Sequence, residues 1–421
     1  MSEDLSAAAF DALPEERGSL REVALVFLRL GWTAFGGPAA HVAMMRREMV
    51  EQRRWLPDQE FLDLFGAANL IPGPSSTELA ILLGFRRAGW RALILAGVLF
   101  ILPAMLLVYS FAWAYVRFGT LPAAEHILYG IKPAIIAVIV TALWGLRRTA
   151  LKGVPHVVAG LAAFLLFLVG VSPLLLLAAG GLFLVLVTLA RRLTTRGANR
   201  LSALAVPITG LAHLYSLLGR APALLRSGIA EVSAGPLLQS AQVSPAGYHP
   251  LTLFLTFLKI GSVLYGSGYV LLAFLRDDFV TRLHWLTNQQ LIDAVAVGQF
   301  TPGPVFTTAT FVGYLTGGWG GGLIATLAIF LPSFFFCAIV LRLVPLTKRW
   351  PLVRAALDGV NAAAVGLMAA VTWQLGRAAV VDRPSALIAL VALALLLRFS
   401  LNSAWLVLAG GAAGLLLKWL I

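Results

Sequence analysis

The hydrophobic and polar positions divide the chain into long apolar runs separated by short basic stretches. Residues 92–116 contain no charged side chain, and residues 153–190 contain no Lys, Arg, Asp or Glu. A transmembrane helix needs roughly 20 mainly apolar residues, so the second run has room for two spans that turn at Ser172-Pro173. Further apolar runs occupy 321–341, 355–376, 384–397 and 399–417. The pattern predicts an all-α polytopic membrane protein with about ten to twelve membrane segments.

The membrane portion occurs twice in the sequence. A shift of 230 positions places FLKIGSVLYGSG (257–268) over FLRLGWTAFGGP (27–38), and a second Pro-Gly-Pro (302–304) over the first (72–74). Self-similarity over this length indicates a duplicated unit. We therefore expect an N-terminal polar tail (1–20), a first repeat (21–190), a linker (191–250) and a second repeat (251–421).

The basic residues indicate that the two halves are inverted. Residues 86–91 carry three arginines and their counterpart 315–320 carries none, whereas 342–354 carries four basic residues and its counterpart 117–132 carries two. Lys and Arg collect in cytoplasmic loops, so equivalent loops are expected on opposite sides of the membrane. Inverted repeats of this kind are typical of secondary transporters.

The Pro-Gly-Pro motifs break helices inside apolar sequence. The stretch between Arg54 and Arg86 is too short for two full spans, which favours a re-entrant hairpin with arms near 58–70 and 75–86. Irregular backbone at membrane depth is tolerated only where protein buries it or water lines it. We expect the tips of both hairpins to face a cavity, although two simple helix kinks remain the other interpretation.

The residues around each tip suit an anion. We expect Ser75 to cap the second arm and Glu78 to complete a capping box, which leaves first-turn amides and the positive end of the helix dipole for an oxyanion. Because Val305 and Phe306 replace the two serines, the tips are expected to act unequally. The candidate substrate-binding residues are Asn69, Pro72, Gly73, Pro74, Ser75, Ser76, Thr77, Gln299, Pro302, Gly303, Pro304 and Thr307.

Charged residues and further glycines supply candidates for coupling and for structure. Arg29 and Lys259 are equivalent in the repeat, and they either tune the potential near the tips or extend to the membrane interface. The other charge and coupling candidates are Arg46, Glu48, Glu78 and His41. The sequence has second breaks at Gly36, Gly37, Gly266 and Gly268. These glycines either bring backbone close to the tips or serve only in helix packing.

Composition narrows the function classes. Cys337 is the only cysteine, so disulfides and thiolate metal sites are excluded, and no phosphate-binding loop for ATP is present. We expect no cofactor, no metal and no nucleic-acid partner. The net charge of +13 fits either cytoplasmic loops or a vestibule that gathers anions. Gly410, Gly411 and Gly414 fit either a homodimer interface or packing within one chain.

A membrane enzyme acting on a lipid-linked phosphate is a second class of function. It would need clustered acids for a metal ion, and the neighbouring acids Asp277 and Asp278 are flanked by Arg276 and Arg282. A solvated charged face explains that cluster better. We therefore expect a transporter and no enzyme.

The motifs together resemble the chromate ion transporter family in its long two-domain form. They are FGGPAAH, RREMVEQRRWL, the paired Pro-Gly-Pro motifs, and FILP with IFLP. Asn69 departs from the glutamine that is usual in the family, and Gly-Ser-Gly (266–268) departs from Gly-Gly-Pro. The resemblance implies a multi-pass carrier of the bacterial inner membrane that exports chromate. The alternative is transport of sulfate or another anion, with coupling to a proton or a counter-anion.

Overall fold

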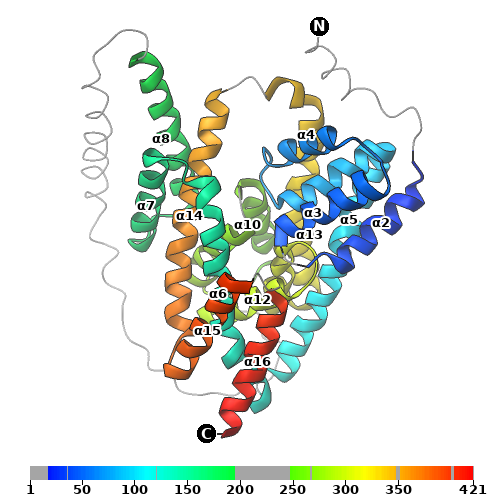
Figure 1. The fold of residues 1–421 in the computed structure, drawn as a ribbon. Coiled ribbons are helices and arrows are strands. Elements are labelled where there is room, and N and C mark those ends of the chain that lie inside the picture. Colours follow the sequence, from blue (N-terminus) through cyan, green and yellow to red (C-terminus); the bar gives the residue numbers. More distant parts are fainter. Residues whose placement is uncertain are drawn as a thin grey trace.

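The computed structural model describes residues 18–35, 37–119, 121–194, 247–265, 268–347, 351–399 and 403–420, which contain helices and no β-strand. The expected linker lies almost entirely outside these residues, as do Gly36, Gly266 and most of the N-terminal tail. Figure 1 shows the helices of the described part. The protein is all-α, as its sequence predicts.

Each half contains the same order of helices. The first half consists of α2 (Leu20–Thr33), α3 (Gly37–Arg46), a π-helical turn (Arg47–Gln52), α4 (Asp58–Ala68), α5 (Ser75–Phe118), α6 (Pro122–Ala150), α7 (Val154–Leu168) and α8 (Pro173–Thr194). The second half consists of α10 (Pro250–Val263), α11 (Leu271–Leu275), a π-helical turn (Arg276–Arg282), α12 (Asn288–Phe300), α13 (Thr308–Thr347), α14 (Pro351–Ala379), α15 (Arg383–Phe399) and α16 (Ser403–Leu420). Short 3₁₀ turns, Gly268–Val270 and Val305–Thr307, precede α11 and α13.

Irregular features recur at equivalent positions and confirm the duplication. Both halves have a π-helical turn, and it is followed by a residue with φ of 52°, Arg54 in one half and His284 in the other. The longest helix of each half is kinked at a glycine with positive φ, Gly89 in α5 and Gly318 in α13. Such departures from regular helix are costly, so their repetition shows that the two halves share one backbone design.

The two predicted hairpins are present. α4 and the first part of α5 form the arms of the first hairpin, and α12 and the first part of α13 form those of the second. The prolines of each tip cannot continue a helix, and Gly73 (φ 135°) and Gly303 (φ 92°) adopt left-handed backbone that disfavours other residues. The Pro-Gly-Pro motifs therefore reverse the chain rather than kink a continuous helix.

Five described helical segments are long and apolar enough to cross a membrane. They are Ser75–Phe118, Ala123–Arg147, Pro173–Arg192, Val305–Leu341 and Leu352–Ala379. This number is smaller than the ten to twelve segments expected, because hairpin arms and shorter apolar helices such as Val154–Leu168 and Pro250–Val263 divide the remaining hydrophobic sequence. Residues 201–219, a moderately apolar stretch of the expected linker that either crosses the membrane or lies on its surface, are outside the described residues.

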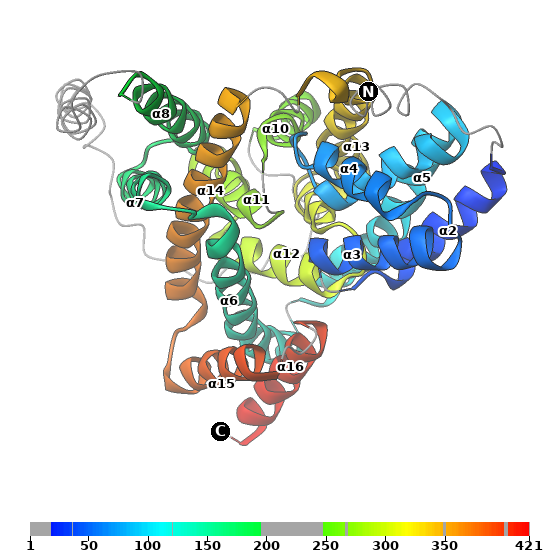
Figure 2. The same ribbon diagram turned by 45° about the horizontal axis from the view of Figure 1, so that its top comes forward.

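The halves interlock through their C-terminal helices. α7 and α8 of the first half pack against α14 of the second, and α15 and α16 of the second half pack against α6 of the first. Figures 1 and 2 both show these groups, with α7 and α8 beside α14 and with α15 and α16 around the lower end of α6. α5 and α13 also cross each other at the centre.

Glycines permit the closest of these helix crossings. Gly410 and Gly414 of α16 lie against the backbone of Gly130 in α6, where any Cβ would overlap main-chain atoms. Gly411 faces Ile127 and Ile131 of the same helix. These glycines therefore pack within the chain, and they no longer support a homodimer interface.

Two backbone hydrogen bonds connect the tips to the opposite halves. The amide of Gly73 donates to the carbonyl of Leu264 at the end of α10 (2.7 Å), and the amide of Gly303 donates to the carbonyl of Ala34 at the end of α2 (2.8 Å). Each bond is the counterpart of the other in the repeat. Reciprocal contacts of this kind are the signature of a two-fold relation, here between two halves of one chain.

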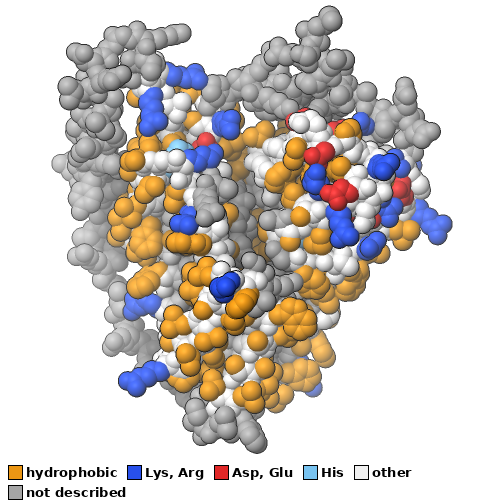
Figure 3. Space-filling view, viewed as in Figure 1, with side chains coloured by type: hydrophobic (Ala, Val, Ile, Leu, Met, Phe, Trp, Pro, Cys, Tyr) orange, Lys and Arg blue, Asp and Glu red, His pale blue; other side chains and the backbone are white. Residues whose placement is uncertain are grey.

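The outer surface is rich in large hydrophobic side chains. Figure 3 shows acidic and basic residues gathered over the end that holds α3 and α4, while much of the rest of this face is hydrophobic. Exposed leucines on the outer helices include Leu161, Leu165, Leu182, Leu186, Leu387 and Leu390. Apolar surface of this extent is expected of helices that face lipid.

Replacement of Gly303 by alanine should destabilise the protein. The residue has positive φ, and its new Cβ would approach the Cβ of Ala104 in the other half to 2.9 Å. We expect a loss of about 1–3 kcal/mol, measured by thermal unfolding in detergent. Gly66→Ala is the matched control, because a Cβ there meets nothing within 4 Å. Equal stability of the two variants would contradict the assignment of the tip as a strained contact.

Candidate substrate site at the first hairpin tip

Both tips lie inside the protein. Pro72, Gly73 and Pro74 are buried, and Ile71 is only 3% exposed. Residues 301–304 of the second tip are buried in the same way. The interior position follows the rule that broken backbone at membrane depth must be enclosed, whereas the expectation that both tips face a cavity stays a prediction.

The predicted serine cap of the second arm is wrong. Pro74 occupies the N-cap position, with extended backbone and no side-chain cap, and its carbonyl accepts hydrogen bonds from the amides of Thr77 (2.7 Å) and Glu78 (3.2 Å). Ser75 is therefore already the first helical residue. The helix begins one residue earlier than expected because the proline ring fixes a φ compatible with the N-cap, so Glu78 is not part of a capping box.

The first tip offers several polar groups to a ligand. The amides of Ser75 and Ser76 lie in the first turn, where helix geometry provides no intrahelical partner. The hydroxyl of Thr77 is fully buried and has no hydrogen-bond partner among the described residues. The hydroxyl of Ser76 is held at 3.3 Å from His41 Nδ1 of α3. A buried donor without a partner is expensive, so the Thr77 hydroxyl and the neighbouring first-turn amides make this tip a candidate binding site.

Glu78 of α5 lies beside the first tip and contacts the second half. Its side chain is completely buried, and Oε1 accepts a hydrogen bond of 3.3 Å from the hydroxyl of Ser333 in α13. Oε2 has no hydrogen-bond partner among the described residues. A Cβ on Gly73 would overlap both Glu78 Oε1 and Ser333 Oγ, so glycine is required where this carboxyl meets the tip.

The second tip satisfies its own hydroxyl groups. Thr307 donates to the carbonyl of Pro304 and Thr308 donates to that of Val305, each at 2.8 Å. Gln299 is buried next to this tip, at 9% exposure. The two tips therefore share a backbone but differ in their available polar groups, in agreement with the expectation that they are unequal.

Asn69 lies at the end of α4 and not over the tip. Its side-chain amide donates to the carbonyl of Phe65 in its own helix (2.9 Å), and the residue is exposed. This contact caps the C-terminus of α4. The role in substrate binding that its spacing suggested stays a prediction.

Arg29 and Lys259 are both paired with an acid from the π-helical turn of their own half. Arg29 lies 3.8 Å from Glu48, and Lys259 lies 2.6 Å from Asp278. The side chains of Arg29 and Lys259 are 68% and 39% exposed, so neither is a buried unpaired charge. Equivalent positions thus form equivalent ion pairs, which explains why the charge is shared across the repeat.

The remaining charge candidates also have structural partners. Glu48 accepts a hydrogen bond from Arg53 (2.8 Å), and Arg46 contacts Asp58 (2.6 Å) and Glu51 (2.8 Å). These contacts assign Glu48 and Arg46 to ion pairs between α3, the following π-helical turn and α4. Of the coupling candidates, His41 and Glu78 are the two that the structure brings to the first tip.

The role of the second breaks stays a prediction, because Gly36 and Gly266 lie outside the described residues. Ala34, which follows α2 and precedes the Gly36-Gly37 break, supplies the carbonyl that Gly303 binds. Gly37 itself has a φ of 80° and open space around it. Gly268 lies opposite Val305 and Phe306 of the second tip, at 3.6 Å or more from where its Cβ would be.

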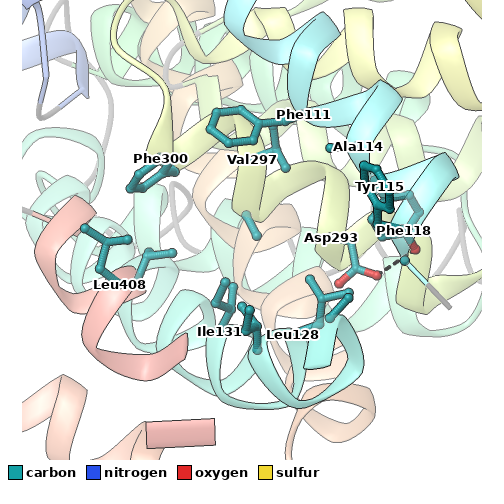
Figure 4. A pocket seen from close by; sticks show the side chains of 15 residues that line it. Phe111, Ala114, Tyr115, Phe118, Leu128, Ile131, Asp293, Val297, Phe300 and Leu408 are labelled. Atoms are coloured by element: carbon teal, nitrogen blue, oxygen red, sulfur yellow. Dashed lines mark hydrogen bonds between the residues drawn. The ribbon is translucent and has the colours of Figure 1, made fainter. Parts of the chain in front are cut away.

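A buried polar cluster on α12 was not among the predicted site residues. Asp293, 2% exposed, lies 3.4 Å from Lys132 of α6 and accepts a hydrogen bond from Tyr115 of α5 (2.9 Å). The cluster borders a largely apolar cavity of about 360 Å³ that extends along α12 to Phe300. Figure 4 shows Asp293 and Tyr115 at one end of it and Phe300 with Leu408 at the other. The identity of Asp63 and Asp293 across the repeat was the available signal.

The described residues contain no group of three or more His, Cys, Asp or Glu side chains arranged to hold a metal ion. The polar groups of the first tip are instead amides, hydroxyls and one carboxyl. Two interlocked halves with paired helical hairpins define a membrane carrier whose candidate site lies at the interface of the halves.

The chain belongs to the chromate transporter family. The family model matches residues 21–185 and again residues 251–415, which confirms that the two halves are homologous. The match covers the helices α2 to α8 and α10 to α16 described above.

Three relatives are similar along nearly their whole length. A chromate transport protein of Cupriavidus metallidurans is 34% identical over 94% of this chain and 92% of its own. A chromate transport protein of Pseudomonas aeruginosa is 33% identical over 94% of this chain and 91% of its own. A probable chromate transport protein of Synechococcus elongatus is 31% identical over 89% of both chains. No solved structure matches the chain.

Removal of Lys132 should leave Asp293 buried without its cation. We expect Lys132→Met to cost about 3–5 kcal/mol of stability, because an uncompensated buried charge is strongly unfavourable. Thermal unfolding of the detergent-solubilised protein measures the loss. The double variant Lys132→Met/Asp293→Leu should recover most of it, and a double variant no more stable than Lys132→Met would refute the ion pair.

Proposed function

We propose that the protein exports chromate across the bacterial inner membrane as a secondary transporter, and that the oxyanion binds at the first hairpin tip. The observation that carries the site assignment is the first-turn position of the Ser75 and Ser76 amides beside the buried Thr77 hydroxyl, which has no hydrogen-bond partner among the described residues. The relatives named as chromate transport proteins support the choice of substrate.

The chemistry of the first tip suits a tetrahedral anion. Amides at a helix N-terminus point toward a bound anion, and the helix dipole adds a partial positive charge. A hydroxyl such as that of Thr77 donates one further hydrogen bond. The second tip shares the buried backbone but directs its hydroxyls to its own carbonyls, so it is proposed as the structural partner of the site.

We further propose that transport proceeds by alternating access of two inverted halves. Each tip is bonded to the end of the first helix of the other half, so a movement of one half carries both tip contacts together. Rocking of one repeat against the other around a fixed central site is the usual consequence of this design.

The membrane potential provides a driving force. A charge that moves through 100 mV gains about 2.3 kcal/mol, so a dianion that leaves an interior-negative cell gains about 4.6 kcal/mol per 100 mV. Export can therefore run on the potential, or by exchange with another anion. Inward movement of sulfate or a related anion with a proton is the second candidate, and the buried carboxyl of Glu78 is the observation that favours it.

Transport in inverted membrane vesicles tests the function directly. Labelled chromate should enter vesicles that contain the protein, faster when a lumen-positive potential is imposed, because export in the cell becomes uptake in this orientation. Unlabelled sulfate serves as competitor, and vesicles without the protein serve as the blank. Movement of sulfate without movement of chromate would retain the carrier and refute chromate export.

Loss of the Thr77 hydroxyl tests the site. Thr77→Val keeps the shape of the side chain and removes one hydrogen bond to a charged ligand, so we expect oxyanion affinity to fall about tenfold. Thr307→Val, the equivalent change at the second tip, should have the smaller effect because that hydroxyl is bonded to Pro304. Thr188→Val on α8 controls for general damage. A larger loss from Thr307→Val would move the site to the second tip.

A further inference from the structure

Glu78 is a fully buried carboxyl with no basic side chain beside it. Burial and the hydroxyl of Ser333 are the influences that the described residues exert on it. The other buried acids among the described residues each have a cation: Glu48 has Arg53, Asp278 has Lys259 and Arg282, and Asp293 has Lys132. An isolated carboxylate in a low-dielectric interior is strongly unfavourable, and such groups at membrane depth are usually functional.

The groups that face Glu78 come from several elements. Cys337 of α13 lies with its sulfur 3.8 Å from the Glu78 carbonyl, and Tyr265, which follows α10, interacts electrostatically with the carboxyl. His41 of α3 faces the hydroxyl of Ser76. The nearby charged side chains of α2 and α4 are engaged elsewhere, in the pairs Glu22 with Arg87, Arg29 with Glu48, and Glu60 with Arg86.

An ionised Glu78 and an oxyanion are incompatible at this tip. The carboxyl lies against Gly73, within the same turn as the amides of Ser75 and Ser76. Like charges at such separations repel strongly where water is excluded. A protonated carboxyl has the opposite effect, because its O–H donates a hydrogen bond to the anion.

We propose that an oxyanion binds at the first tip only when Glu78 carries a proton, so that binding of each anion is linked to one proton. This inference rests on the proposed oxyanion site. When the tip is open to water, the proton is taken up from solvent onto a carboxylate oxygen, and it returns to solvent after the anion leaves. No covalent bond other than this O–H bond forms or breaks.

The second half provides no equivalent group. Thr308 stands where Glu78 stands in the first repeat, and its hydroxyl is bonded to the carbonyl of Val305. The linkage is therefore limited to one proton per anion. Of the two tips, the first is therefore the one at which anion binding depends on a proton.

Calorimetric titration of the purified full-length protein with sulfate tests the proposal. Sulfate remains a dianion throughout the pH range in which proteins are stable, so a change in affinity with pH reports on the protein. Titrations at one pH in two buffers with different ionisation heats count the protons taken up. For the wild type we expect uptake approaching one proton per anion, and an affinity that falls up to about tenfold per unit rise in pH.

The Glu78→Gln variant is the decisive comparison. The amide mimics the neutral carboxyl, so this variant should bind sulfate without proton uptake, with an affinity that does not depend on pH and that matches the wild type at low pH. Glu125→Gln, a change of the same kind at an exposed position on α6, should behave as the wild type. If Glu78→Gln does not fold, the proton count of the wild type still decides.

Three results would overturn the proposal. They are sulfate binding by the wild type without proton uptake at any pH across the range in which the protein is stable, a pH dependence that survives in Glu78→Gln but disappears in His41→Asn, and an affinity that follows sodium concentration instead of pH. Failure of the proposed function is distinct, because it would appear as wild-type protein that neither binds nor transports sulfate or chromate.

Discussion

The structure depends on one constraint: where a helix is broken inside the membrane, the freed backbone amides must find hydrogen-bond acceptors within the protein. The two Pro-Gly-Pro tips meet this requirement in each other's half, where Gly73 binds Leu264 and Gly303 binds Ala34. Because lipid offers no hydrogen bonds, neither tip is stable unless the opposite half is in place. The crossing of α5 and α13 and the exchange of the C-terminal helix pairs follow the same two-fold relation. The candidate site consequently lies where the halves meet.

After the duplication the two hairpin tips have similar backbones but different polar side chains. The tips are buried alike, and the glycines at their turns both have positive φ. The first tip carries serines, an unpaired threonine and a carboxyl, whereas the threonines of the second bind their own turn. The scaffold is two-fold, whereas the proposed site is formed by the first tip. The second tip then serves as its structural partner. The difference lies in a few side chains, which change more easily than the backbone they stand on.

The sequence predicted the features that local pattern and repetition determine. Proline and glycine at the tips predicted the hairpins, and the second copy of the motif located their partner. The start of α5 at Ser75, with Pro74 as its N-cap, was missed because a one-residue shift in a helix boundary depends on backbone geometry, not on the presence of a serine. The contact between Glu78 and Ser333 and the pairing of Asp293 with Lys132 join segments far apart in the chain. No local pattern encodes such contacts, although the repeated acid at 63 and 293 did mark one of them.

The exchange of helices between the halves has a consequence for biogenesis. During synthesis α7 and α8 reach the membrane long before α14, the helix on which they pack, and the amide of Gly73 precedes its acceptor Leu264 by more than the length of one repeat. The first half therefore enters the bilayer before the second half is synthesised. Until then the amide of Gly73 lacks its hydrogen-bond acceptor. The central contacts can therefore close only after these parts of the second half have been inserted, and a chain cut off before Leu264 and α14 exposes the surfaces that they would cover.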